Sequence, residues 1–120
     1  MSSPSLTHEL PPKLELECLK VLWTVQEASV RGIQEEVSKT RPLAYTTVMT
    51  VMDRLARRGC VRRRKSGRSF VYTAVLSRDA VRRLAVQELV HTVFDGCERS
   101  LLSWLHKSDG SEESPIPEDG

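Results

Sequence analysis

The chain has 120 residues, of which 39% are hydrophobic and 28% charged, with a formal net charge of +2. This length fits one domain and leaves no room for a second independent one. No apolar run reaches the ~18 residues that a membrane-spanning helix needs, and the N-terminal residues lack the pattern of a signal peptide, so we expect a cytoplasmic protein without a membrane partner.

The charges are concentrated in two stretches. Residues 54–68 hold eight basic residues and no acid, whereas residues 109–120 hold five acids and no base. The basic stretch is interleaved with apolar residues, which favours a structured surface with a polyanion as its partner. Residues 1–11 and the acidic segment 108–120 are too polar to contribute to a core, so we expect both to be disordered.

Two helices are predicted at the start of the structured region. Apolar residues at steps of three and four predict a helix from about residue 12 to residue 25, with Trp23 closing the core. Ser29 is a suitable N-cap for a second helix, which must end before Pro42 because the residue before a proline avoids helical geometry. The expected buried residues are Leu14, Cys18, Leu19, Leu22 and Trp23 in the first helix and Val30, Ile33 and Val37 in the second.

The third predicted helix, residues 44–58, has an unusual distribution of side chains. Tyrosine and threonine fill its first turn and arginines its last, where an ordinary surface helix carries Lys/Glu pairs. Gly59 follows as a helix-ending residue. The inward stripe is Val48, Val51, Met52 and Leu55, which leaves Thr46, Met49, Thr50, Asp53 and Arg57 facing outward and Tyr45 and Thr47 at the exposed first turn.

The periodicity changes after the third helix. Alternation over residues 61–75 predicts a β-hairpin with Ser66-Gly67 at its turn and basic residues at its tip. Alternation also directs at least one of the arginines at 62–64 to the far side of the hairpin. Three helices followed by a hairpin form a winged helix-turn-helix, in which the third helix reads base edges and the hairpin, or wing, contacts the DNA backbone. The predicted fold class is therefore mainly α with a small antiparallel β-hairpin.

The third helix and the wing supply the candidate DNA contacts. Threonine offers a hydroxyl and a methyl group to base edges, tyrosine a ring and a phenol, and helix N-terminal amides bind phosphate. The alternative for the threonines is bonding to local backbone groups, and for Met49 a place at the flank of the core. The candidates are Tyr45, Thr46, Thr47, Met49, Thr50, Arg54 and Arg57 on the helix and Lys65 and Arg68 on the wing.

A helical region at residues 77–107 follows the winged-helix domain at residues 12–76. Ser77 is a suitable cap for its start, and Asp95-Gly96 divides it. Its apolar stripe is broader than a small core needs, which predicts a twofold homodimer; the alternative is that the region folds back on its own domain. The expected dimer interface consists of Val86, Leu89, Val90, Val93, Phe94, Cys97, Leu101, Trp104 and Leu105.

No pattern in the sequence supports catalysis, a cofactor or a metal site. There is no glycine-rich phosphate loop and no nucleophile with a base nearby, and the histidines are isolated. The three cysteines, Cys18, Cys60 and Cys97, are widely spaced, and we interpret them as small buried hydrophobic residues. A redox switch formed by two Cys97 thiols in a dimer is an alternative, although only Arg99 is near enough in sequence to lower the pKa of the thiol.

In their order, these segments resemble the BlaI/MecI family of bacterial repressors, which includes the penicillinase and methicillin-resistance repressors. The resemblance covers about residues 13–107 and is carried by LELECLKVLW, SVRGIQEEV, LAYTTVMTVMDRLARRG and VRRRKSGRSFVYTAVLSRDAV. It implies a cytoplasmic winged-helix homodimer that binds palindromic operator DNA upstream of antibiotic-resistance or stress genes. By this resemblance the operator-reading helix carries Thr46, Thr47 and Thr50, the wing carries Lys65 and Arg68, and residues 86–105 form the dimer interface.

The chain departs from the family pattern at several points. Ala44 stands where some members have a capping serine, a loss of roughly 1 kcal/mol. The Asn-Phe bond that is cut in members induced by a sensor protease is absent from the matching segment LLSWLHKS, and the paired CxC motifs of copper-responsive relatives are absent too. The acidic tail takes the place of the last dimerisation helix of longer members. The alternatives for the release of the DNA are an inducer and a protease.

These observations lead to one main hypothesis and one alternative. We predict a homodimeric transcriptional repressor, not an enzyme, that binds palindromic double-stranded operator DNA through the helix at 44–58 and the basic wing. The alternative is a winged-helix module that binds another protein through its apolar C-terminal face and attracts polyanions without sequence preference.

Overall fold

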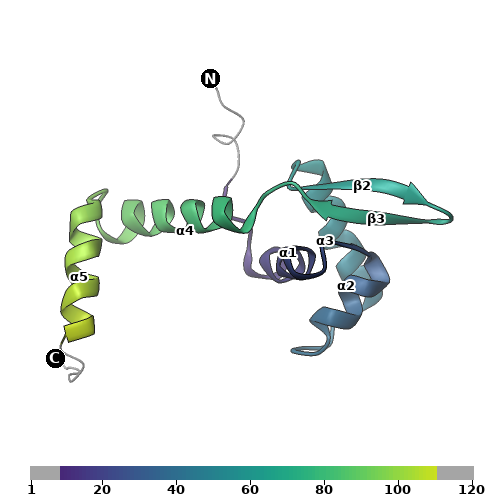
Figure 1. Ribbon diagram of the computed structural model, residues 1–120, viewed down its shortest axis with the longest axis horizontal. Coiled ribbons are helices and arrows are strands. Elements are labelled where there is room, and N and C mark those ends of the chain that lie inside the picture. The colour runs from purple at the N-terminus through teal and green to yellow at the C-terminus, as the bar shows by residue number, and fades with distance from the viewer. Residues whose placement is uncertain (1–8, 111–120) are drawn as a thin grey trace. The chain divides into compact units, whose positions relative to one another are not determined.

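The structure, a computed structural model, describes residues 9–110 (Figure 1). Most of the disorder predicted for residues 1–11 and 108–120 falls on residues 1–8 and 111–120, which lie outside this range. Residues 9–11 are described and Pro11 is buried, contrary to the prediction for that end of the segment. The chain divides into two compact units at Arg83 and Leu84. The elements in chain order are α1 (Lys13–Val25), β1 (Glu27–Ser29), α2 (Val30–Val37), α3 (Tyr45–Arg57), β2 (Val61–Ser66), β3 (Ser69–Ala74), α4 (Arg78–Val93) and α5 (Glu98–Gly110).

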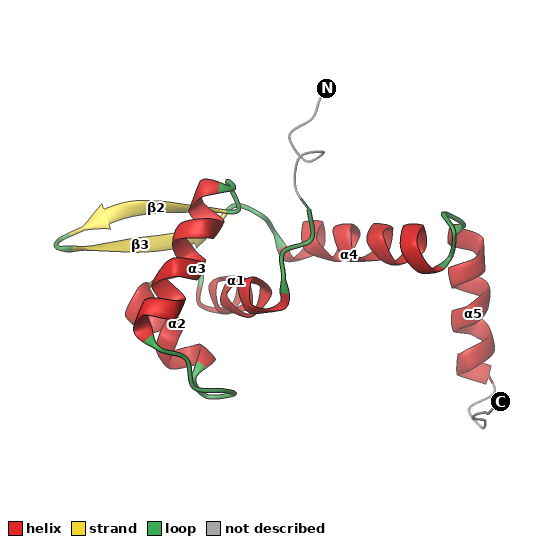
Figure 2. Ribbon diagram, turned by 180° about the vertical axis from the view of Figure 1, so that it is seen from behind, coloured by secondary structure: helices red, strands yellow, loops and turns green. Residues whose placement is uncertain are grey.

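Helices α1, α2 and α3 pack against one another in the first unit (Figure 2). Their bounds follow the predicted stripes closely, because apolar residues three and four apart share one face of a helix. Burial of a large apolar side chain contributes roughly 1.5–3 kcal/mol to the free energy of unfolding. The innermost apolar residues are Cys18, Leu19, Leu22, Ile33, Val48, Met52 and Leu55.

The sheet has three strands in the order β1-β3-β2, one more than the predicted hairpin. Strands β2 and β3 form that hairpin, with Val61 opposite Ala74 and Ser66 opposite Ser69. Gly67 lies at its turn with a φ of +63°, which glycine adopts without strain. The short strand β1 pairs antiparallel with the other edge of β3, so a strand stands between α1 and α2 where none was predicted.

The predicted helix-end signals are confirmed. The Oγ of Ser29 accepts a hydrogen bond from the Gly32 N–H at 3.1 Å at the start of α2. The Oγ of Ser77 accepts one from the Ala80 N–H at 3.0 Å at the start of α4. Gly59 follows α3 with a φ of +79°, the left-handed conformation expected just beyond a helix end.

Substituting Ala44→Ser is expected to raise the free energy of unfolding by about 1 kcal/mol. Ala44 is the extended N-cap residue of α3 and provides no side-chain hydrogen bond to the amides of the first turn. A serine hydroxyl at this position would accept from one of them. Urea unfolding followed by circular dichroism measures the change. The reciprocal control, Ser29→Ala, removes an existing cap and should lower the free energy of unfolding, and no gain from Ala44→Ser would contradict the prediction.

Trp23 lies at the edge of the core and not at its centre. Its side chain is half-buried, and its indole Nε1 donates to the backbone oxygen of Leu76 at 2.9 Å. The guanidinium of Arg78 lies over the indole, 5.4 Å from the ring centre. A buried indole N–H needs a partner, which the apolar interior does not offer. Trp23 therefore ties α1 to the segment that leads into α4.

Helices α4 and α5 are separated at Asp95 and Gly96, as predicted, and both residues have positive φ. Helix α5 continues to Gly110, beyond the predicted end of the helical region at residue 107, so the prediction that disorder begins at residue 108 is wrong. Each residue added to a helix gains a hydrogen bond, so a helix can propagate beyond its apolar stripe. Of the expected interface residues, Val90 and Leu101 are buried within the single chain and Phe94 is half-buried. The exposed ones are Val86, Leu89, Val93, Cys97, Trp104 and Leu105.

The cysteines divide into two kinds. Cys18 and Cys60 are buried as predicted, and burial raises the pKa of Cys18 to about 11. Cys97 is exposed in the single chain, so the prediction that it is buried is wrong there: it lies in the turn just before α5 and not within a helix. Hydrogen bonds with Ser100 lower the pKa of the Cys97 thiol, a local effect that charges near it in the sequence do not reveal.

Candidate nucleic-acid interface

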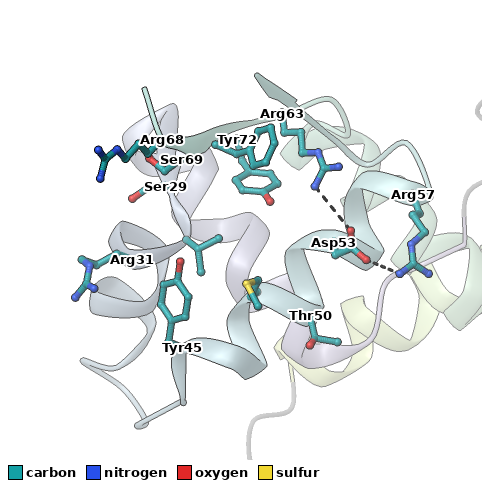
Figure 3. A pocket seen from close by; sticks show the side chains of 13 residues that line it. Ser29, Arg31, Tyr45, Thr50, Asp53, Arg57, Arg63, Arg68, Ser69 and Tyr72 are labelled. Carbon is teal, nitrogen blue, oxygen red and sulfur yellow. Dashed lines mark hydrogen bonds and ion pairs between the residues drawn. The ribbon is translucent and has the colours of Figure 1, made fainter. Parts of the chain in front are cut away.

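A groove of about 760 Å³ lies between α3 and the β2–β3 hairpin (Figure 3). Its lining combines apolar and aromatic side chains with four arginines and one carboxylate. The side chains come from α3, from the hairpin and from the junction of β1 and α2. The lining residues are Ser29, Val30, Arg31, Tyr45, Met49, Thr50, Asp53, Arg57, Arg63, Arg68, Ser69, Phe70 and Tyr72.

The groove brings together several of the predicted DNA contacts. Tyr45, Met49 and Thr50 come from the first half of α3, Arg57 from its last turn and Arg68 from the wing. The side chains of Tyr45 and Met49 are 42% and 45% exposed, which is high for large apolar groups. Exposed apolar groups that lie together on one surface are typical of a binding site.

The other predicted contacts lie outside the groove lining. Thr46 is exposed on α3, whereas Thr47 is half-buried. The Nζ of Lys65 lies 5.9 Å from the centre of the ring of Phe70, a residue that lines the groove. Arg54 is exposed in part, but it pairs with a carboxylate of α1.

The groove also contains Arg31, Arg63 and Phe70, which were not among the predicted contacts. The Arg31 guanidinium lies 5.9 Å from the centre of the Tyr45 ring, and the Arg63 guanidinium lies 4.6 Å from the centre of the Phe70 ring. Cation–π contacts of this kind hold each guanidinium at the groove. The alternation along β2 contained part of this signal, because Arg63 lines the groove while the neighbouring Arg64 pairs with a carboxylate of β1 at 2.6 Å.

A buried carboxylate connects the end of α3 to α1. The side chain of Glu15 is 1% exposed and accepts hydrogen bonds from Arg58 Nη1 at 2.8 Å and Arg54 Nη1 at 3.5 Å. Both guanidinium groups remain about half exposed. The predicted buried stripe contained the neighbouring Leu14 but not Glu15, because a helical glutamate usually faces solvent. Arg54, a predicted phosphate contact, thus also has a partner inside the protein.

Asp53 connects α3 to the wing. Its Oδ2 accepts a hydrogen bond from Arg57 Nη2, and its Oδ1 lies 3.8 Å from Arg63 Nη1 (Figure 3). The Asp53 side chain is 38% exposed, so the pair is open to water. Among the described residues that line the groove, it is the only acid.

Other kinds of site find little support in the described part of the chain. Among residues 9–107, no cluster of histidine, cysteine and carboxylate side chains is arranged to hold a metal ion. None of the described helices combines the length and the apolar character needed to cross a bilayer. The basic and aromatic groove is the candidate binding site among the described residues.

A family model with the description "Penicillinase repressor" matches residues 12–118. The chain belongs to this family. The penicillinase repressor family is that of the BlaI and MecI transcriptional regulators, so the resemblance found in the sequence is confirmed.

Individual members of the family match over most of the chain. The transcriptional regulator BlaI of Mycobacterium tuberculosis is 35% identical over 103 residues, which cover 84% of this chain and 75% of that protein. The methicillin resistance regulatory protein MecI of Mammaliicoccus sciuri is 26% identical over 108 residues, which cover 89% and 87%. A similar solved structure is the solution structure of monomeric BlaI from Bacillus licheniformis in complex with the blaP half-operator. The match has a TM-score of 0.51 and 31% sequence identity, and it covers 60% of this chain and 90% of the BlaI chain. The winged-helix fold class is thereby confirmed.

Proposed function

We propose that this penicillinase repressor family member is a cytoplasmic, homodimeric transcriptional repressor that binds palindromic operator DNA through α3 and the β2–β3 wing. The observation that carries the proposal is the groove, where exposed Tyr45, Met49 and Thr50 of α3 face the arginines of the wing. The B. licheniformis BlaI structure, which shares this fold, is a complex with a half-operator. Two protomers would place two recognition helices about one DNA turn apart.

The start of α3 is suited to reading base edges. Thr46 and Thr50 are exposed, and each carries a hydroxyl for base nitrogens or oxygens and a methyl group for the thymine methyl. Ala44 leaves the amides of the first turn without a side-chain cap. Free amides at a helix N-terminus bind phosphate, so the missing cap favours a DNA backbone contact at this point.

Basic side chains at the far end of α3 and on the wing are suited to phosphates. Arg57, Arg63 and Arg68 line the groove, and Lys65 lies beside it. If each protomer neutralises about three to five phosphates, affinity should fall by several orders of magnitude between ~50 and ~200 mM salt. A binding curve that is insensitive to salt would contradict this assignment.

The exposed apolar residues of α4 and α5 support the dimer. Val86, Leu89 and Val93 of α4 and Trp104 and Leu105 of α5 are between 39% and 62% exposed in the single chain. Soluble domains seldom leave so much apolar surface uncovered, and a second copy related by a twofold axis is the commonest way to cover it.

Selection from a pool of random-sequence duplexes at ~150 mM salt tests the proposed function. The salt weakens non-specific attachment, so only sequences with matching base contacts should be enriched. Recovery of an inverted repeat is the expected result. Recovery of no motif would overturn the proposal and favour the alternative, a winged-helix module that binds a protein partner.

Substituting Thr46→Ala should cost ~1 to 3 kcal/mol of discrimination at one base position in each half of the recovered repeat. Affinity for random-sequence duplex should barely change, because the substitution removes no charge. Fluorescence anisotropy with the repeat and its single-base variants measures both quantities. Thr24→Ala is the matched control, since Thr24 is also exposed and helical but lies on α1. Equal effects of the two substitutions would remove Thr46 from the base-reading surface.

A further inference from the structure

A carboxylate lies where a DNA-binding groove would be expected to carry none. The described lining of the groove contains Arg31, Arg57, Arg63 and Arg68 and a single acid, Asp53. Duplex DNA carries a negative charge about every 1.7 Å along its axis, so a carboxylate in this groove opposes binding. Asp53 must therefore act through its effect on the neighbouring side chains.

Asp53 holds two arginines that belong to different elements. Arg57 lies one turn further along α3 and donates to Oδ2, whereas Arg63 lies on β2 with Nη1 3.8 Å from Oδ1. The guanidinium of Arg63 also lies 4.6 Å from the centre of the Phe70 ring. Arg63 is thus restrained from two sides, by a carboxylate of α3 and by an aromatic ring of β3.

We propose that Asp53 is a positioning residue that restrains Arg57 and Arg63 and thereby limits attachment to DNA of arbitrary sequence. This inference rests on the proposed DNA-binding function. On a duplex without matching bases, only the attraction of the phosphates is available to separate the arginines from the Asp53 carboxylate. On an operator, base contacts made by the start of α3 supply additional free energy for that exchange.

The exposure of the groups makes the restraint reversible. The side chains of Arg57 and Arg63 are 78% and 43% exposed, and that of Asp53 is 38% exposed. Ion pairs that water reaches are weak, so phosphates held close by a specific complex can replace the carboxylate. Because these ion pairs are weak, Asp53 competes with DNA phosphates for the two arginines but does not hold them permanently.

The first test compares the affinities of three proteins for a random-sequence duplex by fluorescence anisotropy over a range of salt concentrations. Asp53→Asn should bind about threefold to tenfold more tightly than the unchanged protein, because both arginines are released. Its salt dependence should be steeper by about 0.9 in slope for each additional phosphate contacted. Asp79→Asn is the matched control: Asp79 forms the same i to i+4 pair, with Arg83 on α4, and does not line the groove.

A second test asks whether Asp53 acts through Arg63. Arg63→Gln should weaken binding to random duplex more in the Asp53→Asn background than in the unchanged protein, since only the released guanidinium is free to contact phosphate. Equal losses in the two backgrounds would overturn the proposal. Circular dichroism of each variant verifies that the fold is retained.

The outcomes separate this inference from the proposed function. An equal gain in affinity for random duplex in Asp53→Asn and Asp79→Asn would mean that only net charge matters. A loss of affinity in Asp53→Asn would mean that the carboxylate supports the binding geometry. Either result would overturn the proposal that Asp53 restrains the two arginines. If the unchanged protein selects an inverted repeat, Asp53→Asn should also reduce the ratio of its affinity for that repeat to its affinity for random duplex. If no repeat is recovered, the proposed function fails while the random-duplex comparison still tests the restraint.

Discussion

The double substitution Arg54→Ala/Arg58→Ala is expected to lower the free energy of unfolding by about 2 to 4 kcal/mol. Both guanidinium groups donate to Glu15, whose side chain is 1% exposed. Without them, the carboxylate remains buried between α1 and α3 and loses both of these donors. A buried charge without compensation is costly, but the two arginines are half exposed, so water entering the site reduces the loss below that of a fully buried pair. Urea unfolding followed by circular dichroism measures the change.

Two further variants show whether the buried charge is the cause. Adding Glu15→Leu to the double variant removes the charge and should restore much of the lost stability, because a buried ion network is often replaceable by an apolar side chain of similar volume. Arg57→Ala on the same helix should cost only ~0.3 to 0.5 kcal/mol, since its pair with Asp53 is exposed. A double variant as stable as Arg57→Ala would show that Glu15 is solvated and does not anchor α3.

Features that depend on neighbouring residues in the chain were predictable from the sequence. The stripe of Val48, Val51, Met52 and Leu55 located α3, because the helical period alone decides which side chains face inward. Ser29 located the start of α2 because its hydroxyl bonds to an amide only three residues away. The exposed first half of α3 followed from the same periodicity.

Features that depend on distant residues were not predictable. Strand β1 is three residues long and is defined by its pairing with Val71, Tyr72 and Thr73, so no alternation within Glu27–Ser29 could indicate it. Glu15 is buried because arginines 39 and 43 residues later in the chain reach it. A local pattern cannot contain such a partner, and a lone glutamate therefore suggests solvent exposure.

Part of the candidate site could be predicted from the sequence, because only some of its residues lie on one helix. Tyr45, Met49 and Thr50 share one helix, so periodicity placed them on one surface. Arg31 enters the site from α2 through its contact with the Tyr45 ring, and Arg63 enters from β2 through Phe70. The packing of α2 and the hairpin beside α3 decides which arginines line the groove. The number of basic residues in the sequence does not show which arginines these are.

Substituting Val93→Glu and Leu105→Glu together is expected to abolish the proposed dimer and to lower affinity for the selected inverted repeat by about 100-fold or more. The two side chains are 62% and 48% exposed in the single chain, so the change should leave each protomer folded. A dimer places its second recognition helix beside the second half-site, and the high effective concentration there raises affinity by ~10² to 10⁴. A monomer loses this gain while keeping its contacts with one half-site. Sedimentation equilibrium and fluorescence anisotropy measure the two effects.

His91→Glu is the control for the added negative charge on α4. His91 is exposed and lies about 200° around the helix from Val93, given 100° for each residue, so it points away from the proposed interface. It should leave both the dimer and the affinity nearly unchanged. A Val93→Glu/Leu105→Glu variant that still sediments as a dimer would move the interface to another surface. A monomeric variant with undiminished affinity would show that one protomer accounts for all of the binding, and the palindromic operator would then have no physical basis in this protein.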